Sequence, residues 1–166
     1  MKRVCVVGCS GAGKTTLAGE IAARTGLPYV SLDARYWHPG WVGAPEDEWY
    51  RTHADLIARD RWVIDGNFFT TLETRLAAAD TAVFVDLPAW RCFLRVLRRS
   101  ARWWGRTRPD MGPGCNERFD PEFLNYVWHF DRDFRPRLIA AMERRPALQI
   151  IPIRNGRERA AFLDGL

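Results

Sequence analysis

Lysine is nearly absent from this sequence. The 166 residues carry a formal net charge of +5, yet the only lysines are Lys2 and Lys14. Almost all of the positive charge is therefore arginine, which is typical of a GC-rich genome in which arginine replaces lysine wherever either side chain serves. Lys14 then stands out as a position that requires lysine itself.

Long apolar segments and paired cysteines are lacking as well. No stretch approaches the roughly 20 apolar residues of a membrane span, and the apolar run at Met1–Gly8 is too short for a signal peptide. The four cysteines have neither the spacing of a zinc site nor that of a disulfide framework: Cys5, Cys9, Cys92 and Cys115. We therefore expect a soluble, cytoplasmic protein without a structural metal.

The pattern of apolar residues predicts one α/β domain over residues 1–166. Five short segments rich in β-branched residues are expected to be buried strands: Arg3–Val7, Tyr29–Leu32, Trp62–Ile64, Thr81–Val85 and Leu148–Ile153. Helical periodicity predicts helices between and after them: Lys14–Arg24, Glu46–Arg59, Ala89–Trp103 and a long one from Pro121 to Arg144, with a kink at Pro136. Alternating strands and helices indicate a parallel sheet in a three-layer α/β/α fold.

The strongest motif lies between the first predicted strand and the first predicted helix. Residues 8–15 read GCSGAGKT and match GxxxxGK[ST], the P-loop that cradles the phosphates of a nucleotide. Lys14 is expected to bridge the β- and γ-phosphates, and Thr15 is expected to bind Mg²⁺. The predicted cofactors are thus Mg²⁺ and ATP, or another nucleoside triphosphate, held by Gly8, Ser10, Gly11, Ala12, Gly13, Lys14, Thr15 and Thr16. The alternative is an accidental glycine-rich turn.

Two further segments resemble adenylate-kinase-like P-loop kinases. Val63–Asn67 is similar to the Asp-Gly segment that ends the third strand of nucleoside monophosphate kinases, and Val85–Pro88, followed by Arg95 and Arg99, is similar to the strand and helix that lead into their lid. The resemblance covers nearly the whole chain and implies the strand order 2-3-1-4-5 with a short lid at 103–118. It implies that Asp65 holds Mg²⁺ through water, that Arg95 lies near the base and that Arg99 contacts the transferred phosphate.

The chain resembles the bacterial DNA topology modulation proteins more closely still. The likeness rests on Leu32–Trp41 and on the Asp-Gly-Asn at 65–67. The name of that group describes a phenotype and not a chemistry. Nucleoside monophosphate kinases have Pro-Arg shortly after the Asp-Gly, whereas this chain has Phe68-Phe69 and no arginine before Arg75, so the acceptor stays open.

Acceptor-binding residues are expected at the ends of the second and third predicted strands. Asp33 resembles the acceptor-binding acid of shikimate and gluconate kinases and could accept a hydroxyl proton during transfer, or it could cap a helix or loop. A small acceptor cover at residues 35–60 carries aromatic rings that either stack on the acceptor or pack onto the core. The predicted substrate contacts are Asp33, Tyr36, Trp37, Trp41, Asn67 and Arg75.

Outside these segments the assignments depend on the resemblance alone. Arg154 and Asn155 follow the last predicted strand, where related kinases contact adenine, or they form a turn that caps the last short helix. Asp86 also ends a strand, and we expect it to be a structural acid. The arginines of 91–108 suit a closing lid, or a nucleic-acid patch.

These patterns predict a phosphotransferase that moves the γ-phosphoryl group of ATP to a small acceptor, with Lys14, Asp33, Arg95 and Arg99 as its catalytic residues. The alternative is a nucleotide-dependent regulatory or DNA-interacting protein without such an acceptor. The expected partners are a nucleotide and a small molecule, with nucleic acid less favoured and no membrane. The chain is expected to be a monomer or a homodimer.

Overall fold

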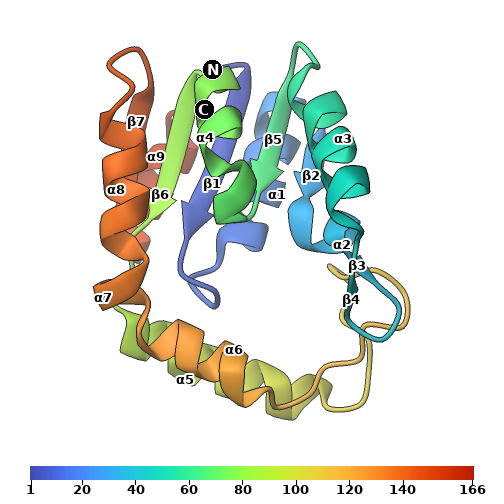
Figure 1. Ribbon diagram of the computed structural model, residues 1–166. Helices are drawn as coiled ribbons and strands as arrows, with labels where there is room; N and C mark the ends of the chain where they lie inside the picture. Colours follow the sequence, from blue (N-terminus) through green and yellow to red (C-terminus); the bar gives the residue numbers. More distant parts are fainter.

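The computed structural model describes residues 1–166, with a five-stranded parallel sheet between two layers of helices. The sheet has the order β2-β5-β1-β6-β7, which is 2-3-1-4-5 when only its own strands are counted, so the predicted fold class is confirmed. Figure 1 shows α3, α4 and α8 in front of the sheet and α1 and α9 behind it. The strands are β1 (Arg3–Gly8), β2 (Tyr29–Ser31), β5 (Trp62–Asp65), β6 (Thr81–Val85) and β7 (Gln149–Ile153).

The central strand β1 and its neighbour β6 lie in the middle of the core. β1 pairs with β5 on one side and with β6 on the other, and residues Val4, Val6 and Val83 have no exposed surface. A strand covered on both faces reads as a continuous apolar run, which is why these strands could be predicted. Because all five strands are parallel, their carboxyl ends share one edge, and the site lies along that edge.

The helices predicted around the P-loop and before the lid lie where the sequence places them. α1 ends at Gly26, whose φ of +66° suits glycine and whose N–H bonds to the carbonyl of Ala22 at 2.9 Å. Asp120 caps α6 by accepting a bond from the N–H of Glu122 at 3.0 Å. The helix bounds are α1 Lys14–Thr25, α3 Glu46–Ile57, α4 Phe69–Ala78, α5 Ala89–Trp103 and α9 Gly156–Asp164.

The long helix predicted from Pro121 to Arg144 is wrong. The segment forms three helices, α6 (Pro121–Trp128), α7 (Phe130–Asp133) and α8 (Arg135–Glu143). The breaks fall at His129, whose backbone leaves helical geometry, and at Phe134, whose backbone stays in the helical region; Pro136 lies in the first turn of α8. Between the breaks, Phe130 packs into the core, and Phe134 packs edge-on against Tyr126.

The cover has more regular structure than the sequence predicts. β2 ends at Ser31 and not at Leu32, because the Ser31 hydroxyl accepts a bond from the N–H of Ala34 and starts a short helix, α2 (Leu32–Tyr36). A small antiparallel hairpin follows, formed by β3 (Trp37–His38) and β4 (Val42–Gly43).

The lid closes onto this hairpin. α5 and α6 lie across the carboxyl edge of the sheet, and the segment between them reaches β3 and β4, so that the backbone forms a ring (Figure 1). The N–H of Gly40 bonds to the carbonyl of Gly114 at 2.9 Å, and the indole N–H of Trp41 bonds to that of Asn116 at 2.7 Å. None of the helices combines the length and the apolar character that crossing a membrane requires.

Candidate nucleotide and acceptor site

The P-loop turns between β1 and α1 and is wedged against β6 and α5. Gly8, Gly11 and Gly13 have φ of +141°, +87° and +97°, conformations that side chains rarely adopt. A Cβ at Gly8 would lie 2.3 Å from the carbonyl oxygen of Val85, and one at Gly11 would lie 2.5 Å from that of Cys92. The glycines thus permit both the turn and its close packing.

Asn67 braces the start of this loop. Its amide oxygen accepts from the N–H of Gly8 at 3.1 Å, and its amide nitrogen donates to the Gly8 carbonyl at 2.8 Å and to the Tyr126 hydroxyl at 3.1 Å. Asn67 lines the cavity described below, but these bonds engage both ends of its amide. The side chain that the sequence places with the acceptor therefore holds the loop in shape.

Thr15 and Asp65 meet beneath the P-loop. The Thr15 hydroxyl donates to Oδ2 of Asp65 at 2.6 Å, while Oδ1 is buried without a partner. Burial raises the pKa of Asp65 to about 6, against the opposing pull of Lys14 and of the Thr15 hydrogen bond. A hydroxyl and a carboxylate with one free oxygen are hard ligands of the kind that fit Mg²⁺.

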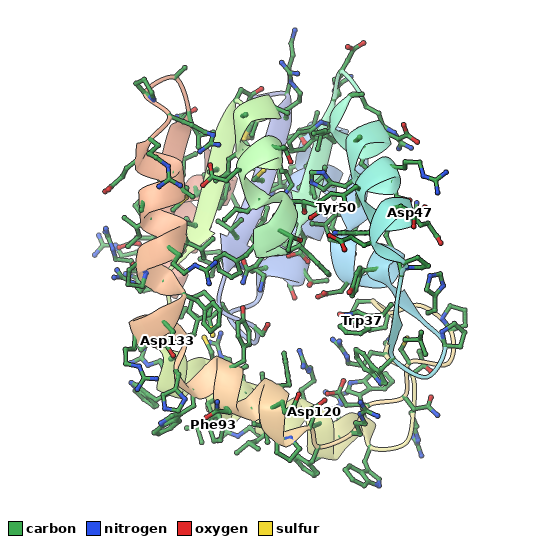
Figure 2. The ribbon with its side chains drawn as sticks, viewed as in Figure 1. Trp37, Asp47, Tyr50, Phe93, Asp120 and Asp133 are labelled. Atoms are coloured by element: carbon green, nitrogen blue, oxygen red, sulfur yellow. The ribbon has the colours of Figure 1, made fainter.

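One cavity of about 880 Å³ opens between the P-loop, the cover and the lid. Trp37 projects toward it in Figure 2, and Asp120 lies at its far side, at the start of α6. The structure brings together there many of the residues predicted from sequence: Ser10, Gly11, Gly13, Lys14, Thr15, Thr16, Asp33, Trp37, Trp41, Asn67, Arg95 and Arg99.

Asp33 is the one predicted acid that opens into this cavity. It lies in the first turn of α2, and no hydrogen bond or ion pair engages its carboxylate; Ser31 is the residue that caps that helix. Although solvent reaches it, the surrounding protein raises its pKa by desolvation, against the pull of Lys14, Arg108 and Arg99.

The arginines at the cavity are held by the chain itself. Arg95 bonds to the carbonyl of Ala12 in the P-loop at 3.3 Å. Nη2 of Arg99 lies 3.6 Å from Oε1 of Glu117, and Nε of Arg108 lies 2.7 Å from Oε2 of the same residue. Glu117 is buried and also accepts from the Ser100 hydroxyl at 2.7 Å, so it joins α5 to the lid.

Sequence reasoning missed several residues of the lid and of α6 at this cavity. The missed residues include Asp110, Met111, Glu117, Phe123 and Tyr126. For Asp110 and Glu117 the only signal in the sequence was their position among the lid arginines, which suggests internal ion pairs; Met111, Phe123 and Tyr126 left no such signal. Arg108 and Arg118 line the cavity, whereas Arg106 does not.

Two predicted substrate contacts are wrong. Arg75 has no exposed surface, and Nη2 donates to the carbonyls of Gly66, at 2.9 Å, and Asn67. It supports the turn after β5 from within and cannot reach a ligand. Tyr36 lies outside the cavity, because its ring packs among Trp37, Trp49 and Phe68, with centroids 4.8 to 5.1 Å apart.

A second, smaller cavity of about 350 Å³ lies on the other side of the P-loop. Ala12, Gly13, Thr16 and Arg95 line it together with Asn155. The side chain of Asn155 also caps α9 by accepting from the N–H of Glu158 at 2.9 Å. Arg154 is exposed and lines neither cavity.

Asp86, the other acid that ends a strand, is held away from the site. Arg135 binds both of its oxygens, at 2.7 and 2.8 Å. Asp86 does not line the cavity, in agreement with a structural role.

Comparison with solved structures finds the same architecture. A shikimate kinase from Acinetobacter baumannii, solved with shikimate, superposes with a TM-score of 0.60 at 18% identity over 99% of this chain and 90% of its own. A gluconokinase from Sinorhizobium meliloti gives 0.54 at 18% identity, with coverage of 99% and 92%. A sugar kinase from a Janibacter species gives 0.55 at 20% identity, with coverage of 99% and 91%.

The chain has the P-loop kinase fold. At these identities the likeness extends to the fold and not to the acceptor. No protein-family model matches the chain, and no curated protein matches it either.

Proposed function

We propose that this protein is a kinase that transfers the γ-phosphoryl group of ATP to a hydroxyl group of a small acceptor. One observation carries the proposal: the carboxylate of Asp33 opens, without a partner, into the same cavity as Lys14 and Thr15 of the P-loop and Arg99 of α5. A base, a phosphate-binding loop and a cation that face one cavity are the parts that phosphoryl transfer needs.

The P-loop would position the nucleotide. Its backbone N–H groups and Lys14 would bind the phosphates, and Thr15 and Asp65 would hold Mg²⁺, which would supply positive charge against the phosphates. The adenine ring would enter the smaller cavity beside Asn155, while exposed Arg154 serves at most the rim. Arg95 lines both cavities and would contact the nucleotide from α5.

Asp33 would act as the base. The acceptor hydroxyl oxygen forms a bond to the γ-phosphorus, the bond from that phosphorus to the β–γ bridging oxygen breaks, and ADP leaves with that electron pair. The hydroxyl proton passes to the Asp33 carboxylate, whose raised pKa makes it a stronger base than an ordinary aspartate. Arg99 would bind the oxygens of the transferred group.

The lid at 103–118 and the cover at 35–60 would exclude water. Their contacts at Gly40, Trp41 and Cys115 close the ring around the cavity. Exclusion of water keeps the phosphoryl group from hydrolysis and strengthens the charged contacts inside. Within this proposal the 166 residues act as one kinase unit, and the closeness to topology modulation proteins stays a sequence-based prediction.

ADP release tests the proposal. The protein is incubated with ATP and Mg²⁺ and pools of nucleosides, nucleoside monophosphates, sugars, hydroxy acids and aminoglycosides. At least one pool should raise the rate about tenfold or more, and Lys14→Ala should lose about 100-fold or more of it because a charged contact to the reacting phosphate is gone. A rate that no pool raises, or a Lys14→Ala variant with full activity, would contradict the assignment.

The outer face of α5 favours a second candidate, a nucleotide-dependent protein that binds DNA. Arg98 and Arg102 are exposed and form no ion pair, and Trp90 of the same helix and Trp104 at its end are 53% and 58% exposed. Free guanidinium groups and indole rings bind phosphates and unstacked bases. This function predicts DNA affinity that falls steeply with salt and that is lost in an Arg98→Glu, Arg102→Glu double variant.

A further inference from the structure

We infer that the acceptor of this kinase carries no negative charge: it is a hydroxyl compound that is neutral or bears an ammonium group. The inference rests on the proposed function and narrows its substrate. It comes from the balance of charges around the acceptor half of the cavity, the part between the cover, the lid and the start of α6.

Every arginine in the acceptor half lies within ion-pair distance of at least one carboxylate. Arg108 lies 2.7 Å from Asp110 and 2.7 Å from Glu117, and Arg99 lies 3.6 Å from Glu117. Arg118 lies 3.6 Å from Asp120. These guanidinium groups keep N–H donors for the transferred phosphoryl group, but their charge is balanced, so they would not attract an anionic acceptor as free arginines would.

With Lys14 and Arg95 on the nucleotide side, the acids in the acceptor half outnumber the cations: Asp33, Asp110, Glu117, Asp120 and Glu122 against Arg99, Arg108 and Arg118. Asp33 has no ion pair, and neither has Glu122 at the start of α6, although both line the cavity. Burial raises the pKa of Asp33, Lys14, Arg108 and Arg99 oppose this rise, and the charge of Asp110 of the lid adds a smaller upward effect. A carboxylate or phosphate on the acceptor would lie among these like charges, whereas an ammonium group would find a partner.

The cover supplies rings to the cavity and no cation. The arginines of the cover lie outside the cavity: Arg35, Arg51 and Arg59. Arg75 is not available either, because it donates to a carbonyl of the turn after β5. Trp37 and Trp41 of the cover line the cavity instead, as does Phe68 just before α4. Indole faces bind the C–H faces of sugars and also attract cations, and neither property suits an anion.

Matched acceptors test the inference. Each set has one scaffold with an acidic, a neutral and an amine-bearing member, for example glucuronate, glucose and glucosamine, with parallel sets of cyclitols and nucleosides. In any set that raises ADP release, we expect kcat/KM of the neutral or amine member to exceed that of the acid by about tenfold or more. An acid that is the best member of its set overturns the inference and leaves the kinase assignment intact.

A second measurement needs no acceptor. With Mg·ADP bound, the fluorescence of Trp37 is taken as the difference between the wild type and Trp37→Phe, and its quenching by caesium and by iodide is compared. Trp90, exposed beside Arg91 on the outer face of α5, gives the matched control through Trp90→Phe.

The two measurements separate the two claims. The two ions differ in intrinsic quenching efficiency, so the ratio of quenching by caesium to quenching by iodide is compared between the two tryptophans. This ratio should be larger for Trp37 than for Trp90, because the local charges differ in sign. A ratio for Trp37 that is equal to or smaller than that for Trp90 overturns the inference. If the ratio is larger for Trp37 while no acceptor raises turnover, the charge assignment of the cavity stands and the kinase function fails.

Discussion

Asp65 combines a structural cost with a predicted role in binding Mg²⁺. It is 3% exposed, one of its oxygens has no partner, and burial raises its pKa from 3.8 to about 6. A shift of that size corresponds to about 3 kcal/mol. Because the folded-state pKa lies above the unfolded value, the ionised group destabilises the protein, and this cost grows as pH rises from the unfolded value toward the folded one.

The Asp65→Asn variant should therefore be more stable than the wild type without ligand. The gain in free energy of unfolding should be about 1 kcal/mol larger at about pH 8 than at about pH 5, because only the higher pH lies above the raised pKa of Asp65. Denaturant unfolding at the two values measures it. An equal effect at both would show that Asp65 does not titrate between them.

The same variant should bind Mg²⁺ less well. The concentration that gives half-maximal activity should rise by about tenfold or more, as for other groups that hold a metal through water. The wild type should gain activity as pH rises through about 6, because the ionised carboxylate binds the metal. An unchanged Mg²⁺ requirement would remove Asp65 from the site.

Single residues show where the sequence was sufficient. Lys14 and Thr15 could be predicted because a local motif fixes their chemistry, and the structure brings both to the cavity. Arg75 and Tyr36 could not, since packing of distant segments decides whether an arginine or a tyrosine is buried. Glu117 was missed for the same reason: it meets Arg99 and Arg108 only in the folded lid.

Among the elements, the contact between the P-loop and α5 leaves little room for change. A Cβ at Gly11 would meet the backbone of Cys92 at 2.5 Å and the side chain of Val96 at 2.9 Å, whereas a Cβ at Gly13 would meet nothing within 4 Å. Both glycines have positive φ, so both substitutions cost backbone strain, but only the first also displaces a helix.

Gly11→Ala should thus lower the free energy of unfolding by about 1 to 3 kcal/mol more than Gly13→Ala does, and it should weaken nucleotide binding. Gly13→Ala is the matched control for the strain alone. Chemical denaturation and titration with Mg·ADP compare the two variants. Equal losses would mean that α5 moves aside without cost.

Elements with a strong local signal were predicted well. The sheet strands are continuous apolar runs, and α5 ends at Trp103 as predicted. The cover hairpin and the breaks at His129 and Phe134 depend on contacts across the fold: the hairpin on lid residues such as Gly114, and the breaks on the packing of Phe130 and Tyr126. Neither leaves a pattern that propensity alone reveals.

At the scale of the whole molecule, the lid and the cover close a ring around the cavity (Figure 1). One side-chain bond in that closure is the 2.7 Å contact from the indole of Trp41 to the carbonyl of Asn116. Trp41→Phe keeps an aromatic side chain and removes the N–H donor, and loss of this hydrogen bond destabilises the closed lid by about 1 kcal/mol. Trypsin should then cut within the lid about five times faster.

Trp128→Phe serves as the control, because Trp128 is 54% exposed on α6 and lies outside the cavity. The same cleavage assay should show no change there. Saturating nucleotide and acceptor should reduce the difference in cleavage rate between Trp41→Phe and the wild type. An unaltered cleavage rate in Trp41→Phe would show that the backbone contacts alone hold the lid.

The central claim is that the γ-phosphoryl group goes to a small molecule and not to water. ATP labelled at its γ-phosphate, incubated with the protein and a small-molecule cell extract, tests it most directly. We predict that the label appears in a new phosphorylated small molecule with the wild type and not with Lys14→Ala. Label found only in inorganic phosphate, or only in unreacted ATP, would contradict the account.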